Sequence, residues 1–239
     1  KDPSALAAWL NGHDGLLSWK LDGLTIVMTY ENGELQKAVT RGNGEVGEVV
    51  TNNARVFVNI PRKISYEGRL VIRGEAVIPY SVFYKMNEEI EDVESQYKNP
   101  RNLCSGSVRQ LNNEITAKRN VHIYGFSVGD VEGMEFHNSL EEKILWAKSL
   151  GFDMVDYVRV EENSLLEAVE QFSRKIEGFD LPSDGLVLVY DDIAYGRSLG
   201  RTAKFPKDSI AFKWADETAV TKLREIEWSP SRTGLINPV

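Results

Sequence analysis

Alternating apolar and polar positions predict a series of β-strands, two of which form a hairpin. Apolar runs over residues 24–30 and 35–40 flank Glu31-Asn32-Gly33-Glu34. Asn-Gly favours a type I′ turn, because both central residues of that turn adopt positive φ, so the two runs are expected to pair. Further strands are expected over residues 68–78, 121–128, 153–160, 186–190 and 209–214, and another is expected to begin within residues 231–239.

Helical patterns with recognisable caps lie between the predicted strands. Ser, Asn and Asp side chains accept hydrogen bonds from the free N–H groups of a first helical turn, so they mark helix starts. In residues 80–90 the amphipathic spacing directs Val82, Phe83 and Met86 toward a core. The predicted helices and caps are residues 3–10 (N-cap Asp2), 80–90, 140–149 (capping box of Ser139 with Glu142) and 165–176 (N-cap Asn163).

Composition restricts the class of protein. The chain has 239 residues, of which 42% are hydrophobic and 27% charged, as in ordinary globular proteins with one large core or two smaller ones. No apolar run approaches the ~20 residues of a membrane span, so we expect no membrane association. Cys104 is the single cysteine and cannot form an internal disulfide, which favours a cytoplasmic location. The three histidines lack metal-ligand spacing, so no metal position is assigned.

Charge is distributed unevenly along the chain. The net charge of −8 argues against a general coat for nucleic acid, but residues 97–119 carry five positive side chains against Glu114 alone. Arginine forks and small polar residues suit anions, so residues 99–102 and 105–107 are interpreted as a phosphate-facing loop. A solvated basic loop is the alternative. The five positive side chains are Lys98, Arg101, Arg109, Lys118 and Arg119.

Lys20 is the main candidate for chemistry. It stands in Lys20-Leu21-Asp22-Gly23, directly before the predicted hairpin, where a rigid element would hold it in place. The alternative is an ordinary surface lysine before an Asp-Gly turn. Three glycines in residues 40–48 indicate a sharp turn or a close approach to a ligand. Arg73, Glu75 and Lys213 lie in apolar strands and need partners or a ligand, because burying an unpaired charge is unfavourable.

Eight short motifs occur in the order found in the covalent nucleotidyltransferase superfamily, and the chain resembles that family from about Gly15 to its end. Residues 100–110 and 232–238 closely resemble the bacterial NAD-dependent DNA ligases in particular. The eight motifs are Lys20-x-Asp22-Gly23, Thr40-Arg41-Gly42, Arg73-Gly74-Glu75-Ala76, Asn99-Pro100-Arg101-Asn102, Val108-Arg109-Gln110-Leu111, Ile123-Tyr124-Gly125, Asp184-Gly185 and Ala211-Phe212-Lys213.

This resemblance implies an α+β fold of mixed, largely antiparallel sheets with helices around a nucleotide cleft. It also implies a nucleotidyltransferase (adenylation) domain over residues 1–218, followed at 219–239 by a linker and the first strand of an oligonucleotide-binding fold. The family's N-terminal subdomain, which grips nicotinamide mononucleotide, has no counterpart ahead of Lys1. We therefore expect either a parent protein that is longer at both ends or a reduced relative.

The implied activity is that of a NAD-dependent DNA ligase, which forms a phosphoric ester bond in three steps. Lys20 would attack the α-phosphorus of NAD to form lysyl-AMP, AMP would pass to the 5′-phosphate of nicked DNA, and a 3′-hydroxyl would seal the nick. Lysine nitrogen is a good nucleophile once deprotonated, and such transfers depend mainly on positioning and charge neutralisation. The expected partners are NAD or AMP, Mg²⁺ and nicked double-stranded DNA, with a monomeric chain acting in replication and repair.

The resemblance also implies roles for individual residues. Glu75 would hold a ribose hydroxyl, Tyr124 would stack on adenine, and Lys213 would touch the α-phosphate. The implied catalytic residues are Lys20, Asp22 and Lys213. The implied nucleotide-binding residues are Lys20, Leu21, Gly23, Arg41, Glu75, Tyr124, Asp184 and Lys213. Arg101 and Arg109 are the implied DNA or phosphate contacts.

Three positions depart from the family pattern. Ser18 replaces a glutamate that reads adenine, Asn43 replaces an aspartate, and Val189 replaces a lysine that faces phosphate. These departures leave open a diverged or truncated homologue that binds nucleotide or nicked DNA with little or no catalysis. An ATP-dependent DNA ligase or RNA ligase is a third possibility, although it accounts poorly for residues 100–110.

Overall fold

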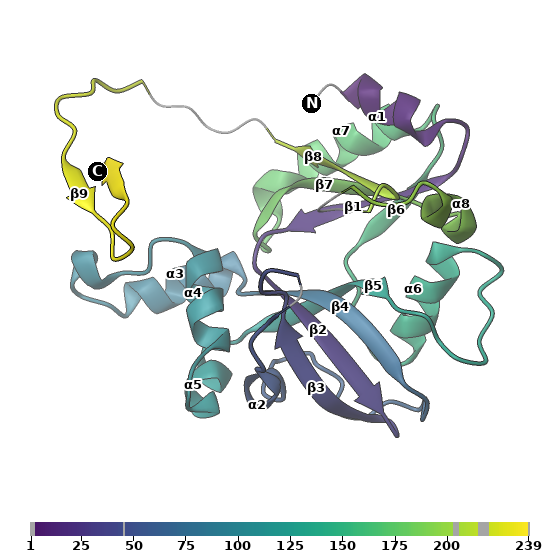
Figure 1. Cartoon of the computed structure of the whole chain (residues 1–239), viewed down its shortest axis with the longest axis horizontal. Coiled ribbons are helices and arrows are strands. Elements are labelled where there is room, and N and C mark those ends of the chain that lie inside the picture. The colour runs from purple at the N-terminus through teal and green to yellow at the C-terminus, as the bar shows by residue number, and fades with distance from the viewer. Residues whose placement is uncertain (1–2, 45, 203–205, 215–219, 239) are drawn as a thin grey trace.

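Antiparallel pairing produces two four-stranded sheets joined by a short crossover. The computed structural model describes residues 3–44, 46–202, 206–214 and 220–238 (Figure 1). Sheet 1 has the strand order β6-β1-β7-β8, with β6 Tyr157–Val160, β1 Gly15–Leu21, β7 Ser183–Tyr190 and β8 Ser209–Lys213. Sheet 2 has the order β3-β2-β4-β5, with β3 Glu34–Thr40, β2 Leu24–Glu31, β4 Leu70–Val77 and β5 His122–Val128.

Eight α-helices occur in the described residues, and none of them combines the length and apolar character needed to cross a bilayer. Figure 1 shows α1 and α7 together beside sheet 1, and α3, α4 and α5 at one end of sheet 2. The helices are α1 Pro3–Leu10, α2 Thr51–Ala54, α3 Tyr80–Glu88, α4 Pro100–Val108, α5 Asn113–Lys118, α6 Leu140–Ser149, α7 Leu165–Lys175 and α8 Ile193–Ser198. Short 3₁₀ turns occur at Val93–Ser95 and Ile176–Gly178.

The predicted hairpin and the N-cap at Ser139 are confirmed, but the capping box is only half formed, because the Ser139 N–H donates to the Phe136 carbonyl and Glu142 Oε2 pairs with His137. Asn32 and Gly33 have φ of 52° and 72°, as a type I′ turn requires, and β2 pairs with β3 on either side of them. Ser139 accepts a hydrogen bond from the Glu142 N–H at the start of α6. The predicted cap of α7 was wrong by one residue, since Ser164 rather than Asn163 takes the N-cap position. Asp2 lies outside the described residues.

The sequence reading missed β1 and therefore misplaced Lys20. We expected Lys20 at the mouth of the hairpin, but it lies near the end of β1 in sheet 1, whereas the hairpin belongs to sheet 2. Leu17, Trp19 and Leu21 pack into one hydrophobic cluster, whereas only Leu16 on the opposite face packs into the other. The buried residues alternate with the partly exposed Ser18 and Lys20, so β1 carried a period-2 signal that the prediction overlooked.

The segment interpreted as a phosphate-facing loop is mainly a helix. Asn99 caps α4 by accepting a hydrogen bond from the Asn102 N–H at 2.8 Å, and Pro100 occupies the first turn. Leu103 and Cys104 are buried on its inner face. Two expected strand starts were also wrong. The strand expected over residues 153–160 begins at Tyr157 as β6, and the strand expected from residue 186 begins at Ser183 as β7.

The C-terminal stretch forms a small hairpin. β9 (Trp228–Pro230) pairs antiparallel with β10 (Ile236–Pro238), where we expected one opening strand. The division into a domain over residues 1–218 and a following segment stays a prediction.

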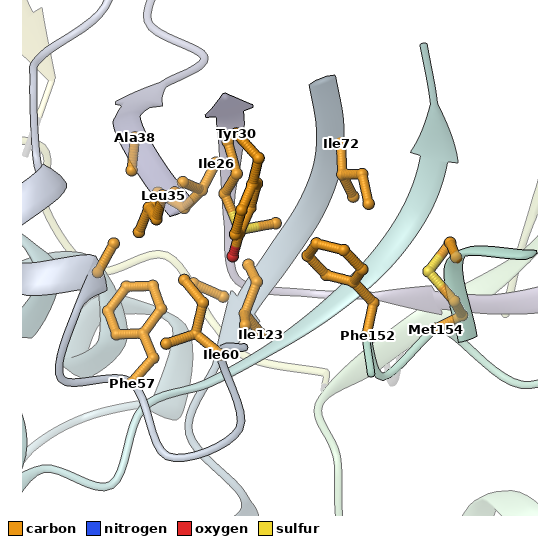
Figure 2. Packing of buried hydrophobic residues seen from close by; sticks show 14 of the residues in the cluster. Ile26, Tyr30, Leu35, Ala38, Phe57, Ile60, Ile72, Ile123, Phe152 and Met154 are labelled. Atoms are coloured by element: carbon orange, nitrogen blue, oxygen red, sulfur yellow. The ribbon is translucent and has the colours of Figure 1, made fainter. Parts of the chain in front are cut away.

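Two hydrophobic clusters hold the sheets. Cluster 1 lies under sheet 2 and includes Ile26, Tyr30, Ile72 and Phe152 (Figure 2). The Tyr30 and Phe152 rings meet edge to face with centroids 5.1 Å apart, and the Tyr30 hydroxyl donates to the Pro61 carbonyl at 2.8 Å. Cluster 2 packs α1 and α7 on the face of sheet 1 that bears Leu17, Trp19 and Leu21. The alternate residues of β1, including Lys20, therefore face the other side of sheet 1.

The crossover between the sheets has room only for glycine at position 23. Asp22 N–H donates to the Pro182 carbonyl at 2.8 Å, and Gly23 N–H donates to Glu75 Oε1 at 3.1 Å. A Cβ at Gly23 would lie 2.0 Å from the Ala76 carbonyl oxygen, which belongs to a strand that cannot move independently. The last strand residues of sheet 1 and the first of sheet 2 are thus held against β4.

We predict that Gly23→Ala lowers the free energy of unfolding by about 2 kcal/mol or more, because the added methyl group forces β4 away from the crossover. Urea denaturation of the two proteins measures the difference. Gly106→Ala is the matched control: a Cβ there meets nothing within 4 Å, and alanine in the exposed face of α4 is expected to stabilise the helix slightly. Equal stability of Gly23→Ala and the wild type would contradict the argument.

Candidate functional site

Lys20, Asp184 and Lys213 meet on three neighbouring strands of sheet 1. The register places Lys20 on β1 and Lys213 on β8 opposite Gly185 of β7, one on each side. The Lys20 Nζ lies 2.8 Å from Asp184 Oδ1 and 3.0 Å from Oδ2, and the Lys213 Nζ lies 2.9 Å from Oδ2. One carboxylate thus links two ammonium groups that pairing alone would leave close together and repelling each other.

Electrostatics favour an ionised Asp184. Partial burial by itself raises the pKa of this carboxyl, but hydrogen bonds from Lys20 and Lys213 and their positive charges outweigh the burial and lower the pKa. The Lys20 side chain is 29% exposed and the Lys213 side chain 65% exposed, so Lys20 is the more sheltered amine. Asp184 is within hydrogen-bond reach of that amine, which places it where a proton acceptor would be needed.

Glu75 reaches the crossover from sheet 2. Its carboxylate accepts hydrogen bonds from the Gly23 N–H and from Thr25 Oγ1, the latter at 2.8 Å. Burial raises the pKa of Glu75, and the two hydrogen bonds and the Lys20 charge only partly offset that effect. The side chain is therefore a half-buried acceptor held beside the Lys20 segment.

Asp22 and Arg101 connect this segment to α4. The Arg101 Nη1 lies 2.9 Å from Asp22 Oδ1. Arg101, Ser105 and Arg109 follow each other at intervals of four residues, so they form one stripe along α4. Arg109 pairs with Glu48 and Ser105, and in the described residues it has no contact with the Lys20 cluster.

Other predicted nucleotide-binding residues lie around the same face of sheet 2. Tyr124 stands directly opposite Glu75 in the β4–β5 register, and its pKa is raised by burial and then by the nearby carboxylates of Asp153, Asp156 and Asp180. Tyr124 also lines a pocket with Lys148, residues 151–154 and Asp156, and neither Glu75 nor the Lys20 cluster contributes to its lining. Arg41 donates its backbone N–H to the Thr25 carbonyl at 3.0 Å.

Leu21 differs from the other members of the predicted set. Its side chain is buried in cluster 2, on the opposite side of β1 from Lys20, so only its main chain could meet a nucleotide. Arg73, which we expected to need a partner, is exposed on β4 and makes no ion pair among the described residues. Its solvent exposure removes the need for one.

Two of the positions that depart from the family pattern, Ser18 and Val189, lie in sheet 1 on the same face as Lys20. Ser18 is two residues before Lys20 on β1 and opposite Val187, whose carbonyl accepts its hydroxyl at 3.4 Å. Val189 is opposite Leu16, farther from the carboxylate of Asp184. The side chains next to Lys20 on this face of the sheet are therefore small and uncharged, namely those of Ser18, Val187 and Val189.

Sequence reasoning missed several residues that hold the site. Thr25 bonds Glu75, Ser183 donates its hydroxyl to the Lys20 carbonyl at 2.9 Å, and Glu48 pairs with Arg109. Thr25 stands directly opposite Glu75 in the β2–β4 register, a pairing that only the order and register of the strands decide. Nothing in the sequence marks Glu48 or Ser183 as a partner of residues so far along the chain.

The described residues do not by themselves form a metal site, since no group of three His, Cys, Asp or Glu side chains among them could hold an ion. Asp22, Glu75 and Asp184 are acidic, but each already accepts hydrogen bonds or ion pairs. Mg²⁺ in phosphoryl-transfer sites usually takes one or two carboxylates together with substrate phosphates and water. A magnesium ion here would therefore depend mainly on the substrate for its ligands.

Two four-stranded antiparallel sheets that meet at a crossover, with Lys20, Asp184 and Lys213 beside it, have the arrangement of a nucleotidyltransferase domain. The chain belongs to the NAD-dependent DNA ligase adenylation domain family, whose model matches residues 11–217.

Relatives from two clostridial species are similar along the whole chain. Proteins named DNA ligase from Ruminiclostridium cellulolyticum and Lachnoclostridium phytofermentans are each 61% identical to it over 239 residues. The chain spans 36% and 37% of their lengths. A solved structure of a putative ATP-dependent DNA ligase from Aquifex aeolicus matches 79% of this chain and 43% of its own, with 15% identity and a TM-score of 0.45.

We predict that Glu75→Gln changes how stability depends on pH. Because folding raises the pKa of Glu75 above its ordinary value of 4.5, the folded state binds this proton more tightly than the unfolded state. The resulting stabilisation is fully present below about pH 4.5 and is lost as the pH rises through the folded-state pKa. Glutamine carries no such proton, so the variant should gain stability relative to wild type as pH increases.

Urea unfolding of both proteins from about pH 4 to about pH 8 measures this difference. Glu34→Gln is the control, because it removes one carboxylate whose side chain is 55% exposed. A difference between wild type and Glu75→Gln that does not change with pH would contradict the assignment.

Proposed function

We propose that this chain is the catalytic core of a NAD-dependent DNA ligase and that Lys20 carries AMP. The observation that supports this most directly is the contact of Lys20 and Lys213 with the single carboxylate of Asp184. A sheltered amine beside a proton acceptor and a second cation has the groups that an attack on a phosphate needs.

In the first step, the uncharged Lys20 amine attacks the α-phosphorus of NAD. A nitrogen–phosphorus bond forms, the bond from that phosphorus to the bridging oxygen breaks, and nicotinamide mononucleotide leaves with the electron pair. The amine proton passes to a base, for which Asp184 is within reach at 2.8 Å. The ammonium group of Lys213 offsets negative charge that develops on the phosphate oxygens.

Glu75 and Tyr124 are proposed to orient the nucleotide. The half-buried Glu75 carboxylate would accept a ribose hydroxyl as it accepts the Thr25 hydroxyl, and the half-buried Tyr124 ring would present a face for adenine. Asp22 is proposed to act in catalysis, and Arg41, Gly23 and the Leu21 main chain to complete the nucleotide site. When Mg²⁺ binds, it would supply further charge neutralisation at the phosphates.

The later steps involve nicked double-stranded DNA. AMP passes from Lys20 to the 5′-phosphate at the nick, and the 3′-hydroxyl then displaces AMP to form the phosphodiester bond. Arg101 and Arg109 are proposed phosphate contacts, because guanidinium forks match phosphate oxygens. The proposal includes a monomeric, cytoplasmic enzyme that acts in DNA replication and repair, the processes that generate nicks.

Intact-mass spectrometry tests the central step. The chain is incubated with magnesium and either NAD or ATP, beside Lys20→Ala and the control Lys37→Ala, an exposed lysine on β3. We expect one added AMP with NAD in the wild type and in Lys37→Ala, none in Lys20→Ala, and none with ATP.

An adduct that persists in Lys20→Ala would refute Lys20 as the nucleophile. If the wild type forms no adduct, the same test is made after joining the residues that precede the matching segment in the Ruminiclostridium relative. Absence of the adduct from that protein as well would refute the proposed activity.

Asp184→Asn tests the proton acceptor and charge balance together. Asparagine has the same shape but cannot take the amine proton or offset two ammonium groups, so adduct formation should slow by roughly 10²-fold or more. Single-turnover mass measurements give the rate, and thermal unfolding shows whether the fold is retained. An unchanged rate in a folded variant would contradict the role given to Asp184.

A further inference from the structure

Three exposed apolar side chains flank the ion pair between Arg109 and Glu48. Val46 is 73% exposed, Val49 is 66% exposed, and Leu111 is fully exposed. Val46 and Val49 stand on either side of Glu48 in the sequence, Leu111 is two residues beyond Arg109, and the ion pair joins the two segments. We call Val46, Val49, Arg109 and Leu111 the Leu111 surface.

Ordered backbone holds the Leu111 surface in place. Thr40 N–H donates to the Glu48 carbonyl at 2.9 Å, and Glu48 N–H donates to Thr40 Oγ1 at 2.9 Å. On the other segment, the Asn53 amide donates to the Gln110 carbonyl at 2.8 Å, next to Leu111. These apolar groups are therefore displayed on fixed main chain, which reduces the entropy lost on binding.

Arg109 is oriented but retains donors for a ligand. Its Nε donates to Glu48 and its Nη1 donates to Ser105. A guanidinium has five N–H donors, so three remain without a contact among the described residues. Glu48 and Ser105 thus fix the plane of the group and leave its outer edge available.

The chemistry of the surface matches the wall of a nucleic-acid groove. Arg109 belongs to residues 97–119, a stretch of the sequence with five positive side chains and one negative, and this local excess of positive charge favours a polyanion as the partner. Glu48 offsets part of the Arg109 charge. Fully exposed leucine is unfavourable in water, and sugars and base edges in a groove offer apolar surface beside phosphates. An arginine between aliphatic side chains suits this alternation of phosphate and sugar.

We infer that the Leu111 surface docks against a groove of duplex DNA, with Arg109 on a phosphate and Leu111 and Val49 against neighbouring sugars. This inference rests on the proposed DNA contact of Arg109 and adds the apolar part of the interface. Leu111 and Val49 contribute by removing apolar surface from water, whereas Arg109 contributes by the attraction between its positive charge and a phosphate.

Salt dependence separates the two contributions. Binding of the chain to a fluorescent nicked duplex is followed by anisotropy over a series of salt concentrations. Leu111→Ser should weaken binding roughly three- to tenfold at every salt concentration and leave the slope of log affinity against log salt unchanged. Arg109→Ala should weaken binding and reduce that slope by about one.

Leu145→Ser is the matched control, because Leu145 is a 51% exposed leucine on α6 and the substitution is the same. Thermal unfolding of all variants confirms that they fold. Equal DNA affinity of Leu111→Ser and Leu145→Ser would overturn the inference about the apolar contact. If Arg109→Ala still binds more weakly than wild type in that case, the proposed phosphate contact stands. Unchanged binding by Arg109→Ala, or no binding by the wild type, would overturn both.

Discussion

The shared carboxylate of Asp184 is the interaction on which the site depends. Strand pairing places Lys20 and Lys213 opposite the same residue of β7, so their charges would repel without an anion between them. A register shift after Lys20 brings Asp184 to that position at the end of the sheet. Three strands must therefore pair correctly before the two amines and the carboxylate meet, which links the chemistry of the site to the folding of sheet 1.

A second constraint is the close approach of the crossover to β4. Gly23 leaves no space for a side chain, and its N–H donates to Glu75 of sheet 2. Glu75 and Lys20 belong to different sheets, but the crossover holds them near one another through two residues of chain. The polar groups proposed to bind a nucleotide therefore keep their spacing only while the two sheets are packed together.

The two arginines at α4 show how an acidic chain can orient guanidinium groups for the proposed phosphate contacts. Arg101 and Arg109 are each held by one carboxylate, from Asp22 and Glu48, so the guanidinium planes are oriented before any ligand arrives. These exposed pairs add little stability, because solvent screens them and ordering both side chains costs entropy. Their geometry matters more, since a preoriented fork loses less freedom on meeting a phosphate.

Local patterns in the sequence determined the hairpin at Asn32-Gly33, the N-cap at Ser139 and the inward face of α3, because turn geometry and caps depend on neighbouring residues. The motif order also identified the family and the fold. Strand β1 was missed although Leu17, Trp19 and Leu21 alternate with Ser18 and Lys20, since these residues were interpreted as the lead into the hairpin. The helix α4 was missed although Asn99 and Pro100 marked its start, since its basic composition was given more weight than its cap.

Only the tertiary structure decided which groups meet. Lys20 and Asp184 are 164 residues apart, and Arg109 and Glu48 are 61 apart. No periodicity covers such separations, because pairing partners and register are chosen by the packing of whole sheets. The sequence by itself therefore determined the chemical groups and the family, whereas the contacts of Asp184 with two lysines and of Glu48 with Arg109 came from strand order and sheet packing.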